Sequence, residues 1–267
     1  MIHREDRDSV AILRIDYGEG NLMDVELLNE IEQSLDEVVQ SGAKALVLTG
    51  NDSVFMAGGN ILPGAELGRK YFSVFLPTTN KVNKHLFTLP LPTVAAVNGD
   101  AIADGCFLAT ACDYRVMTNG TAQIGLNGLV LGVPMPVTLL EVFRYLIPTH
   151  YVQALLYTGK LQSPSEALKI GLVDALASPG SVVDQACKVA SQLGQIPNES
   201  FVINKQQIRQ PAVERIERYS RLWDKKIVNI WSSPEILARI RVAAKNISGV
   251  YARYVKSAPP VDYDEFR

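Results

Sequence analysis

Two short, uninterrupted apolar runs constrain the fold of this chain more than any other feature. They read Ala-Leu-Val-Leu-Thr at residues 45–49 and Thr-Val-Ala-Ala-Val at residues 93–97. Runs of this length are typical of strands buried on both faces, as in a parallel sheet covered by helices. Apolar residues recur at helical spacing over 27–39, and a second helical stretch over 66–89 separates the two runs. This order of elements predicts an α/β fold.

Further elements are predicted on both sides of these runs. Strands are expected over 10–17, 113–117 and 122–124, and helices over 105–111, 151–158, 163–170 and 182–193. Ser163 is the expected N-cap of the helix that starts at Pro164. A later apolar stripe at three- and four-residue steps is expected to face the core or another subunit. It consists of Ile216, Tyr219, Trp223, Ile227 and Ile230.

These patterns divide the chain into two parts. Residues 1–195 form the predicted α/β core, and residues 196–267 form a helical carboxy-terminal region, with an extended tail over 257–267. No repeat of the solenoid kind and no low-complexity linker interrupts this order.

Composition narrows the classes of function. The chain has 267 residues, with 26 basic and 28 acidic side chains and a formal net charge of −2, which gives no electrostatic reason to bind nucleic acid or an acidic membrane. Three cysteines without metal-ligand spacing suit a reducing compartment. The charged amino-terminal residues and the absence of a long apolar run lead us to expect a cytoplasmic protein.

Two glycine-bearing loops follow the apolar runs. The first spans residues 54–61 and contains Gly58 and Gly59, and the second spans 98–106 and opens the helix expected from Gly105. Ligands of open α/β sheets bind beyond the carboxyl ends of the strands, and the first amides of a helix attract anions. Two converging amides can form an oxyanion hole, although a glycine after a strand is also common in simple turns.

Both loops resemble motifs of the crotonase superfamily, the enoyl-CoA hydratases and isomerases. Residues 55–61 read Phe-Met-Ala-Gly-Gly-Asn-Ile and resemble F-x-A-G-x-D-[IL]. Residues 95–106 read Ala-Ala-Val-Asn-Gly-Asp-Ala-Ile-Ala-Asp-Gly-Cys and resemble A-x-[IV]-N-G-x-A-x-G-G-G-C. The resemblance covers residues 10–180 and ends in Glu-Ala-Leu-Lys-Ile-Gly-Leu-Val-Asp at 166–174. It is greatest to the mitochondrial-type double-bond isomerase branch.

This resemblance implies a spiral of ββα units, a carboxy-terminal region used in trimers or dimers of trimers, and an acyl thioester on coenzyme A or an acyl carrier. It implies no separate cofactor and no metal. The oxyanion-hole amides would be those of Gly59 and Asp104. The residues expected around the substrate are Ala57, Gly58, Gly105, Phe107, Gly128 and Met135.

The usual catalytic glutamates of the family are absent from the matching positions. Phe107 and Gly128 stand where the hydratases have their two glutamates, and the isomerases keep the second of these. A third site used by other members falls near Met135, which also cannot titrate. Because neither an apolar side chain nor a hydrogen can transfer a proton, the two-glutamate addition of water is not expected.

Five other residues are candidates for the missing acid or base, each with a structural alternative. The Asp104 carboxylate lies beside the expected hole, but it is favoured as an N-cap of the helix at Gly105. For Asp100, the structural alternative to catalysis is a role in the turn after Asn98 and Gly99. For His85 and Tyr71, the alternative is packing on their helix. Glu141, on an apolar helix after Pro136, is the acid–base residue we select, against the alternative of a solvated or paired glutamate.

Three functions remain open at this point. The first is an isomerase-like enzyme with a displaced base that acts on an enoyl thioester. The second is a lyase that decarboxylates a malonyl-type thioester, for which only a proton donor is needed. The third is a non-catalytic thioester-binding protein, since a fold does not specify its chemistry.

Restoring a carboxylate by Gly128→Glu tests the expected position of the pocket. If the scaffold is that of an isomerase, the variant gains enoyl-CoA isomerase activity over the natural protein, because a base then faces the substrate. The measurement is double-bond migration in an enoyl-CoA. A correctly folded variant without any gain contradicts this placement of the pocket.

Overall fold

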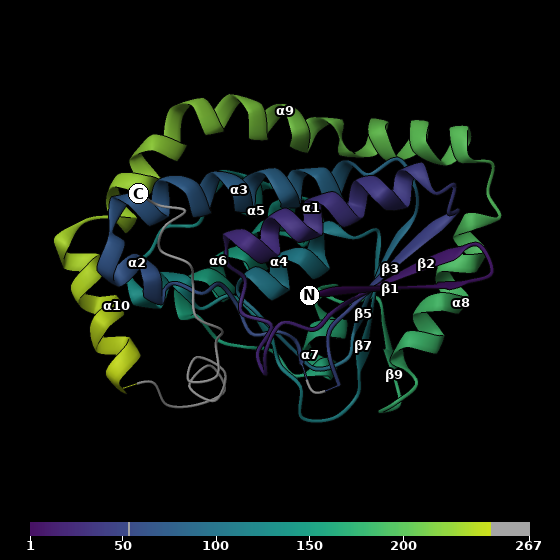
Figure 1. Cartoon of the computed structure of the whole chain (residues 1–267), viewed down its shortest axis with the longest axis horizontal. Helices are drawn as coiled ribbons and strands as arrows, with labels where there is room; N and C mark the ends of the chain where they lie inside the picture. The colour runs from purple at the N-terminus through teal and green to yellow at the C-terminus, as the bar shows by residue number, and fades with distance from the viewer. Residues whose placement is uncertain (53, 247–267) are drawn as a thin grey trace.

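The computed structural model describes residues 1–52 and 54–246, and it is an α/β protein built on two sheets (Figure 1). The larger sheet has six strands in the order β1-β2-β3-β5-β7-β9. All neighbours in it are parallel except β1 and β2. Its strands are β1 (Ile2–Arg7), β2 (Val10–Ile15), β3 (Ala45–Thr49), β5 (Thr93–Val97), β7 (Tyr114–Thr118) and β9 (Ala175–Ala177).

The smaller sheet consists of three very short parallel strands in the order β4-β6-β8. They are β4 (Val54–Met56), β6 (Asp100–Ile102) and β8 (Ile124–Gly125). Each follows a strand of the larger sheet directly in sequence, and each is followed by a helix. The chain therefore repeats a strand–strand–helix unit, which agrees with the expected ββα units.

The helices in chain order are α1 (Val25–Gln40), α2 (Leu62–Leu67), α3 (Arg69–Thr88), α4 (Asp104–Ala111), α5 (Val137–Leu146), α6 (Thr149–Thr158), α7 (Pro164–Lys169), α8 (Val182–Gly194), α9 (Asn198–Trp231) and α10 (Pro234–Asn246), with a short 3₁₀ turn η1 (Gly128–Leu131). The helix expected over 66–89 is divided, because α2 ends at Leu67 and Gly68 has a φ of 55° that a helix cannot contain. Ser163 caps α7 in a capping box with Glu166, which confirms the predicted N-cap.

Both faces of the larger sheet are covered, as its apolar strands predict. Leu46 and Leu48 belong to the main core, which includes α1, α3, α4 and α5. Ala45 and Val47 point to the other face, where α8 packs with Ala186 and other small residues. Every residue of β3 and β5 is buried. Each fully buried Val or Leu stabilises the fold by about 1.5–3 kcal/mol, so these strands anchor the structure.

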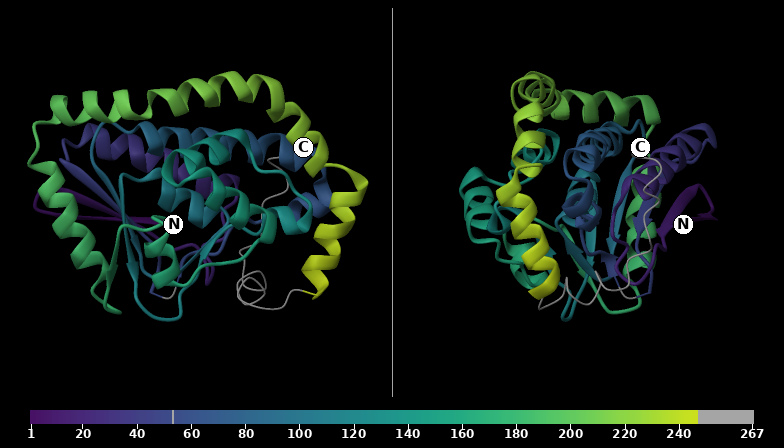
Figure 2. Two further views of the ribbon diagram at one scale, coloured as in Figure 1. Left: turned by 180° about the vertical axis from the view of Figure 1, so that it is seen from behind. Right: turned by 60° about the vertical axis from the view of Figure 1, so that its left-hand side comes forward.

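Helices α9 and α10 fold back over the core of the same chain. Helix α9 has 34 residues, runs along α3 and packs against α3 and α5, while α10 turns back beside α2 (Figures 1 and 2). The expected apolar stripe faces the core in part: Ile216 and Ile227 are buried, whereas Trp223 is 47% exposed in the single chain. The alternative that Trp223 faces another subunit stays a prediction. Trp231, at the end of α9, is the tryptophan that reaches the core. The extended tail expected over 257–267 lies outside the described residues.

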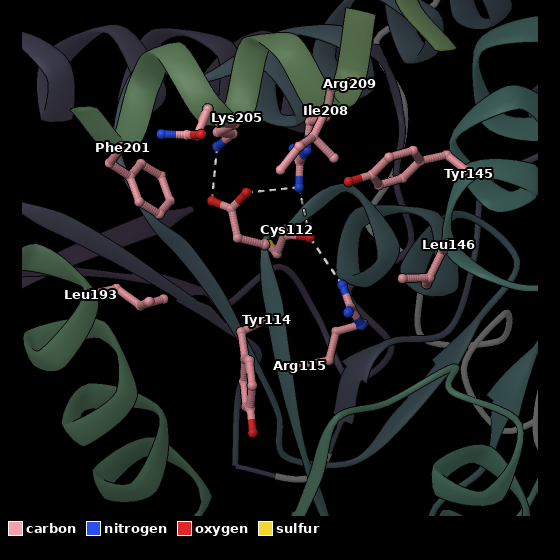
Figure 3. A pocket seen from close by; sticks show the side chains of 12 residues that line it. Cys112, Tyr114, Arg115, Tyr145, Leu146, Leu193, Phe201, Lys205, Ile208 and Arg209 are labelled. Carbon is pink, nitrogen blue, oxygen red and sulfur yellow. Dashed lines mark hydrogen bonds and ion pairs between the residues drawn. The ribbon is translucent and has the colours of Figure 1, made fainter. Parts of the chain in front are cut away.

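A buried ion cluster attaches α9 to the sheet. Lys205 and Arg209 descend from α9 (Figure 3), and each pairs with one oxygen of Asp113, at 2.8 and 2.7 Å. The other partners of Asp113 are the backbone N–H and the hydroxyl of Thr93. The Arg209 guanidinium also lies 4.1 Å from the ring centre of Phe87. Burial lowers the pKa of Lys205 to about 8, with the Asp113 carboxylate opposing that shift.

Replacing Asp113 by alanine leaves two buried cations without their carboxylate, and we expect the free energy of unfolding to fall by about 3–5 kcal/mol. Urea unfolding followed by circular dichroism measures this change. The matched control is Glu235→Ala, which removes an exposed partner of Arg239 and should leave the unfolding midpoint unchanged. Equal midpoints for the natural protein and Asp113→Ala would contradict a stabilising role for the cluster.

Candidate active site

The smaller sheet brings two backbone segments together at one edge. Strands β4 and β6 are parallel, with Met56 opposite Ala101, so their carboxyl ends lie side by side. The prediction of plain loops directly after strands 45–49 and 93–97 is therefore wrong in one respect. Each of these segments contains a short strand of the smaller sheet. A strand of three residues is too short for a recognisable sequence pattern.

The first segment, residues 57–59, is fixed by hydrogen bonds to residues 20–23. Ala57 N–H donates to the carbonyl of Gly20 at 2.9 Å, and the Gly58 carbonyl accepts from Met23 N–H at 2.9 Å. Gly58 has a φ of 119°, which residues with a side chain rarely adopt. The loop is thus anchored on one side, and Gly59 N–H points to the other side, toward Asp104.

The second segment is pressed against the first. A Cβ atom at Gly105 would lie 2.1 Å from the Met56 carbonyl oxygen, so only glycine lets α4 begin this close to β4. Ala103 precedes α4 with a φ of 50° and ψ of −110°, a conformation that costs about 1–3 kcal/mol for a residue with a side chain. Backbone strain of this kind is common at functional sites, and here it lies directly before the first residue of α4.

The two segments converge on the side chain of Asp104. Asp104 Oδ2 lies so close to Gly59 that an added Cβ there would be 2.7 Å from it, and hydrogen bonding by the backbone N–H groups of Gly59 and Asp104 lowers the pKa of the carboxyl group. Burial raises the pKa of Asp104 to about 6, and these two hydrogen bonds oppose the rise. The N-cap role expected for Asp104 is wrong, because α4 starts at Asp104 itself and its N-cap residue is Ala103. The carboxylate instead occupies the place where the two amides meet.

An apolar cavity of about 290 Å³ opens beside this carboxylate. Its wall is formed by Phe75, Leu76, Ala103, Asp104, Phe107, Leu126, Gly128, Leu129, Val133, Pro134, Met135, Pro136, Leu139, Leu140, Leu156 and Trp231. Of these lining residues, all of which lie in the described part of the chain, Asp104 alone can exchange a proton near neutral pH. The cavity thus combines a hydrocarbon-like wall with one titratable group and two aimed amides.

Three of the six expected substrate-binding residues line this cavity, namely Phe107, Gly128 and Met135. The other three, Ala57, Gly58 and Gly105, form the backbone beside it without reaching the wall. A Cβ at Gly128 would have Val133 Cγ2 as its nearest neighbour at 3.3 Å, so a side chain at this position needs only a small shift of Val133.

Apart from Asp104, the remaining wall residues were not identified from the sequence. Several of them come from helices distant along the chain, and Trp231 is the clearest example. Its indole N–H donates to the Pro134 carbonyl at 2.8 Å, and its ring lies 5.1 Å from that of Phe72 on α3. The only sequence signal for burial of Trp231 is its position at the end of a long amphipathic helix.

Glu141, the acid–base candidate selected from the sequence, lies elsewhere. It is 2% exposed, and its two oxygens pair with Arg144 at 3.0 Å and Arg215 at 2.7 Å. It is not among the residues that line the cavity. This geometry matches the paired-glutamate alternative, in which Glu141 connects α5 to α9.

The other three candidates also lie away from the cavity wall. His85 faces carboxylates of α1 at 3.2 and 3.7 Å, and Asp100 accepts a hydrogen bond from Gln123 N–H at 2.8 Å. The Tyr71 hydroxyl donates to the Asn60 carbonyl at 2.5 Å from a fully buried position. Each therefore has a structural partner.

A larger cavity of about 520 Å³ surrounds the Asp113 ion cluster (Figure 3). Asp113 is paired there with Lys205 and Arg209, so its charge is already neutralised within the protein. The cavity beside Asp104 is the better candidate because the two glycine-bearing segments meet beside it and its lining is apolar except for Asp104.

Residues 1–52 and 54–246 contain no group of three His, Cys, Asp or Glu side chains arranged to hold a metal ion. Within the same residues, no helix is both long enough and apolar enough to cross a membrane.

Comparison with known proteins decides the family. Residues 5–233 match the enoyl-CoA hydratase/isomerase family. The chain belongs to this family. Mouse mitochondrial enoyl-CoA delta isomerase 1 is 28% identical over 81% of this chain and 76% of that protein. A short-chain-enoyl-CoA hydratase of Clostridium acetobutylicum is also 28% identical, over 76% of this chain and 79% of that protein.

The fold agrees with this family. Human mitochondrial delta3-delta2-enoyl-CoA isomerase superposes with a TM-score of 0.86, covering 92% of this chain and 97% of that chain, at 24% identity. The crotonase-like α/β fold with a helical carboxy-terminal region, expected from the sequence, is thereby confirmed, as is the resemblance to the crotonase superfamily.

The raised pKa of Asp104 predicts a pH-dependent difference in stability between the natural protein and Asp104→Asn. A folded-state pKa of about 6, above the ordinary value of 3.8, means that the folded protein holds a proton that the unfolded chain has lost between these pH values. The natural protein therefore loses stability relative to the variant as pH rises from about 4 to 6, by about 1–3 kcal/mol in total, and no further above that.

Urea unfolding of both proteins at a series of pH values measures this difference. Asp184→Asn is the matched control, because Asp184 also lies in the first turn of a helix but is 67% exposed and pairs with Arg7 at the surface. A surface ion pair contributes about 0–1 kcal/mol, so the stability of this variant should stay within about 1 kcal/mol of that of the natural protein at every pH. A constant difference for Asp104→Asn between pH 4 and 7 would contradict the raised pKa.

Proposed function

We propose that this protein binds an acyl-CoA thioester in the 290 Å³ cavity and catalyses a reaction that passes through the enolate of that thioester. One observation supports this most: the Asp104 carboxyl group, whose pKa is lowered by the backbone N–H groups of Gly59 and Asp104 from separate loops, lines an apolar cavity. In a thioester complex, the same two donors would hold the carbonyl oxygen and stabilise its negative charge in the enolate.

The apolar wall suits the hydrocarbon part of an acyl chain. Phe75, Leu139 and Leu156 come from three different helices and give the cavity a largely apolar surface. The relatives named as enoyl-CoA isomerases and hydratases favour coenzyme A as the carrier. A thioester on an acyl carrier protein is the alternative carrier in this proposal. In both cases coenzyme A or phosphopantetheine belongs to the substrate rather than to a resident cofactor.

An isomerase-like reaction is the best match to the proton-transfer groups of the site. Addition of water by two carboxylates has no support, because Phe107 and Gly128 occupy the expected positions on the cavity wall. Moving a double bond requires one group that takes a proton from one carbon and returns it to another. Decarboxylation of a malonyl-type thioester is the second candidate, favoured by the single titratable side chain in the wall.

The assembly and compartment are further parts of the proposal. We expect a homotrimer or a dimer of trimers in the cytoplasm, with α9 contributing to subunit contacts. Large apolar side chains on α9 support this contact, since Ile208 is 60% and Leu222 is 62% exposed in the single chain. Burial of such residues between subunits is favourable.

Isotope exchange distinguishes these functions. The protein is incubated with medium-chain acyl-CoA and 3-enoyl-CoA in deuterated water, and separately with malonyl-CoA. We expect deuterium at the α-carbon and double-bond migration, which support the isomerase-like reaction, whereas release of carbon dioxide supports the lyase. Saturable binding without any reaction indicates a non-catalytic protein.

A matched pair of variants locates the reaction in the cavity. Leu156→Trp fills the cavity from α6 and should weaken thioester binding at least tenfold, because the indole takes the space of the acyl chain. Leu168→Trp makes the same change on α7, where the leucine is 41% exposed and outside the cavity, and should bind normally. Equal binding by both variants would place the substrate elsewhere.

A further inference from the structure

Asp104 contributes both its backbone and its side chain to the site. Its backbone N–H is one of the two converging amides, and its side chain is the group on which both amides converge. Gly59 approaches so closely that a Cβ there would lie 2.7 Å from Asp104 Oδ2. A thioester oxygen can therefore reach the amides only after this carboxylate has moved away.

Charge sets the condition for that exchange. Two anions about 4 Å apart repel by several kcal/mol where water is scarce, so an ionised Asp104 and an enolate oxygen do not coexist at these amides. The conflict disappears if the carboxylate takes the proton whose removal creates the enolate. The site then carries one negative charge throughout: it is on the displaced Asp104 carboxylate before the proton transfer and on the enolate oxygen, at the amides, after it.

We propose that the Asp104 carboxyl group is the catalytic acid–base group of this cavity and that it exchanges the two amides with the thioester oxygen; this inference rests on the proposed function. With a 3-enoyl thioester, the C2–H bond breaks and an O–H bond forms on Asp104, while the electron pair of C2 moves into the enolate. The O–H bond then breaks as a C4–H bond forms, the double bond shifts, and the carboxylate returns to the amides. No other reactant is needed.

Substrate binding itself activates the base in this scheme. In the free protein, the Gly59 and Asp104 N–H groups lower the pKa of the carboxyl group against the effect of burial. When a neutral thioester oxygen takes over these donors, the carboxylate loses them and becomes more basic, because it remains in an apolar environment. The base is therefore restrained until a thioester is in place.

No other titratable group of the neighbouring elements competes for this role among the described residues. On α4, the Cys106 thiol is buried, which raises its pKa, and on α3 the Tyr71 hydroxyl is bound to a backbone carbonyl. On α5, Glu141 is paired with two arginines, and on α9 Asp224 accepts a hydrogen bond from the Asn80 side-chain amide at 3.5 Å. None of these residues lines the cavity.

Asp104→Asn and Asp104→Ala test the proposal. Asparagine keeps the size and helix position of the side chain, and alanine leaves the two amides uncovered. Exchange of α-protons of a medium-chain acyl-CoA in deuterated water should fall at least about 100-fold in both variants, the range expected for loss of a general base. Affinity for the same acyl-CoA, measured by calorimetry, should be retained or increased, because no carboxylate then competes for the amides.

The pH dependence gives an independent signature. In the natural protein, kcat/KM for exchange should rise as pH increases through about 6, because the free protein must be ionised at Asp104 to act as a base. Acyl-CoA affinity should change in the opposite direction and be greater below pH 6, where the protonated group no longer competes as an anion. Asp104→Asn should lose the part of the pH dependence of affinity that Asp104 causes. Any pH dependence that comes from the titration of coenzyme A itself should remain in this variant. Asp184→Asn should behave as the natural protein does.

The outcomes separate this inference from the proposed function. Undiminished exchange in folded Asp104→Asn and Asp104→Ala would overturn the role of Asp104 and leave the enolate chemistry intact. Saturable binding without exchange in the natural protein would overturn the catalytic role and leave a thioester-binding site. Failure of the natural protein and all variants to bind acyl-CoA would overturn both.

Discussion

The pairing of β4 with β6 is the contact on which the rest of the site depends. The strands are only three residues long, yet their parallel alignment places the loop at Gly59 beside the first turn of α4. Gly105 makes this possible because a side chain there would collide with the Met56 carbonyl. The larger sheet supplies the stability for this arrangement, since β3 and β5 are buried on both faces and hold the two short strands that follow them in the chain.

The electrostatics of the site follow from this packing. A carboxylate in a mostly apolar cavity is costly, and the protein compensates part of the cost with two backbone hydrogen bonds. The result is a group whose pKa of about 6 lies in the range useful for proton transfer near neutral pH. Two other buried carboxylates, Glu141 and Asp113, are each paired with cationic side chains. Arg144 and Arg215 pair with Glu141, and Lys205 and Arg209 pair with Asp113.

Much of the fold could be predicted from local patterns, and the exceptions have physical reasons. The strands at 45–49 and 93–97 and the cap at Ser163 have strong local signals and were found. Strands β4 and β6 show no local pattern, because three residues are too few for a periodicity. The apolar stripe on α9 predicts residues that face the core or another subunit, but it does not predict which of them reach the core. Ile216 is buried and Trp223 is exposed in the single chain, since the burial of a residue on a long helix depends on where its neighbours end.

The sequence by itself determined the family, the glycine-bearing segments and the lack of carboxylates at residues 107 and 128, because these features depend on which residues occupy a local motif. Only the tertiary structure decided between Asp104 and Glu141 as the group that faces the cavity. Both are acidic residues in the first half of a helix, and the local sequence around each does not show which of them faces the cavity. The difference arises from distant partners: arginines on α5 and α9 engage Glu141, whereas the amide of Gly59 meets Asp104 across the junction of two strands.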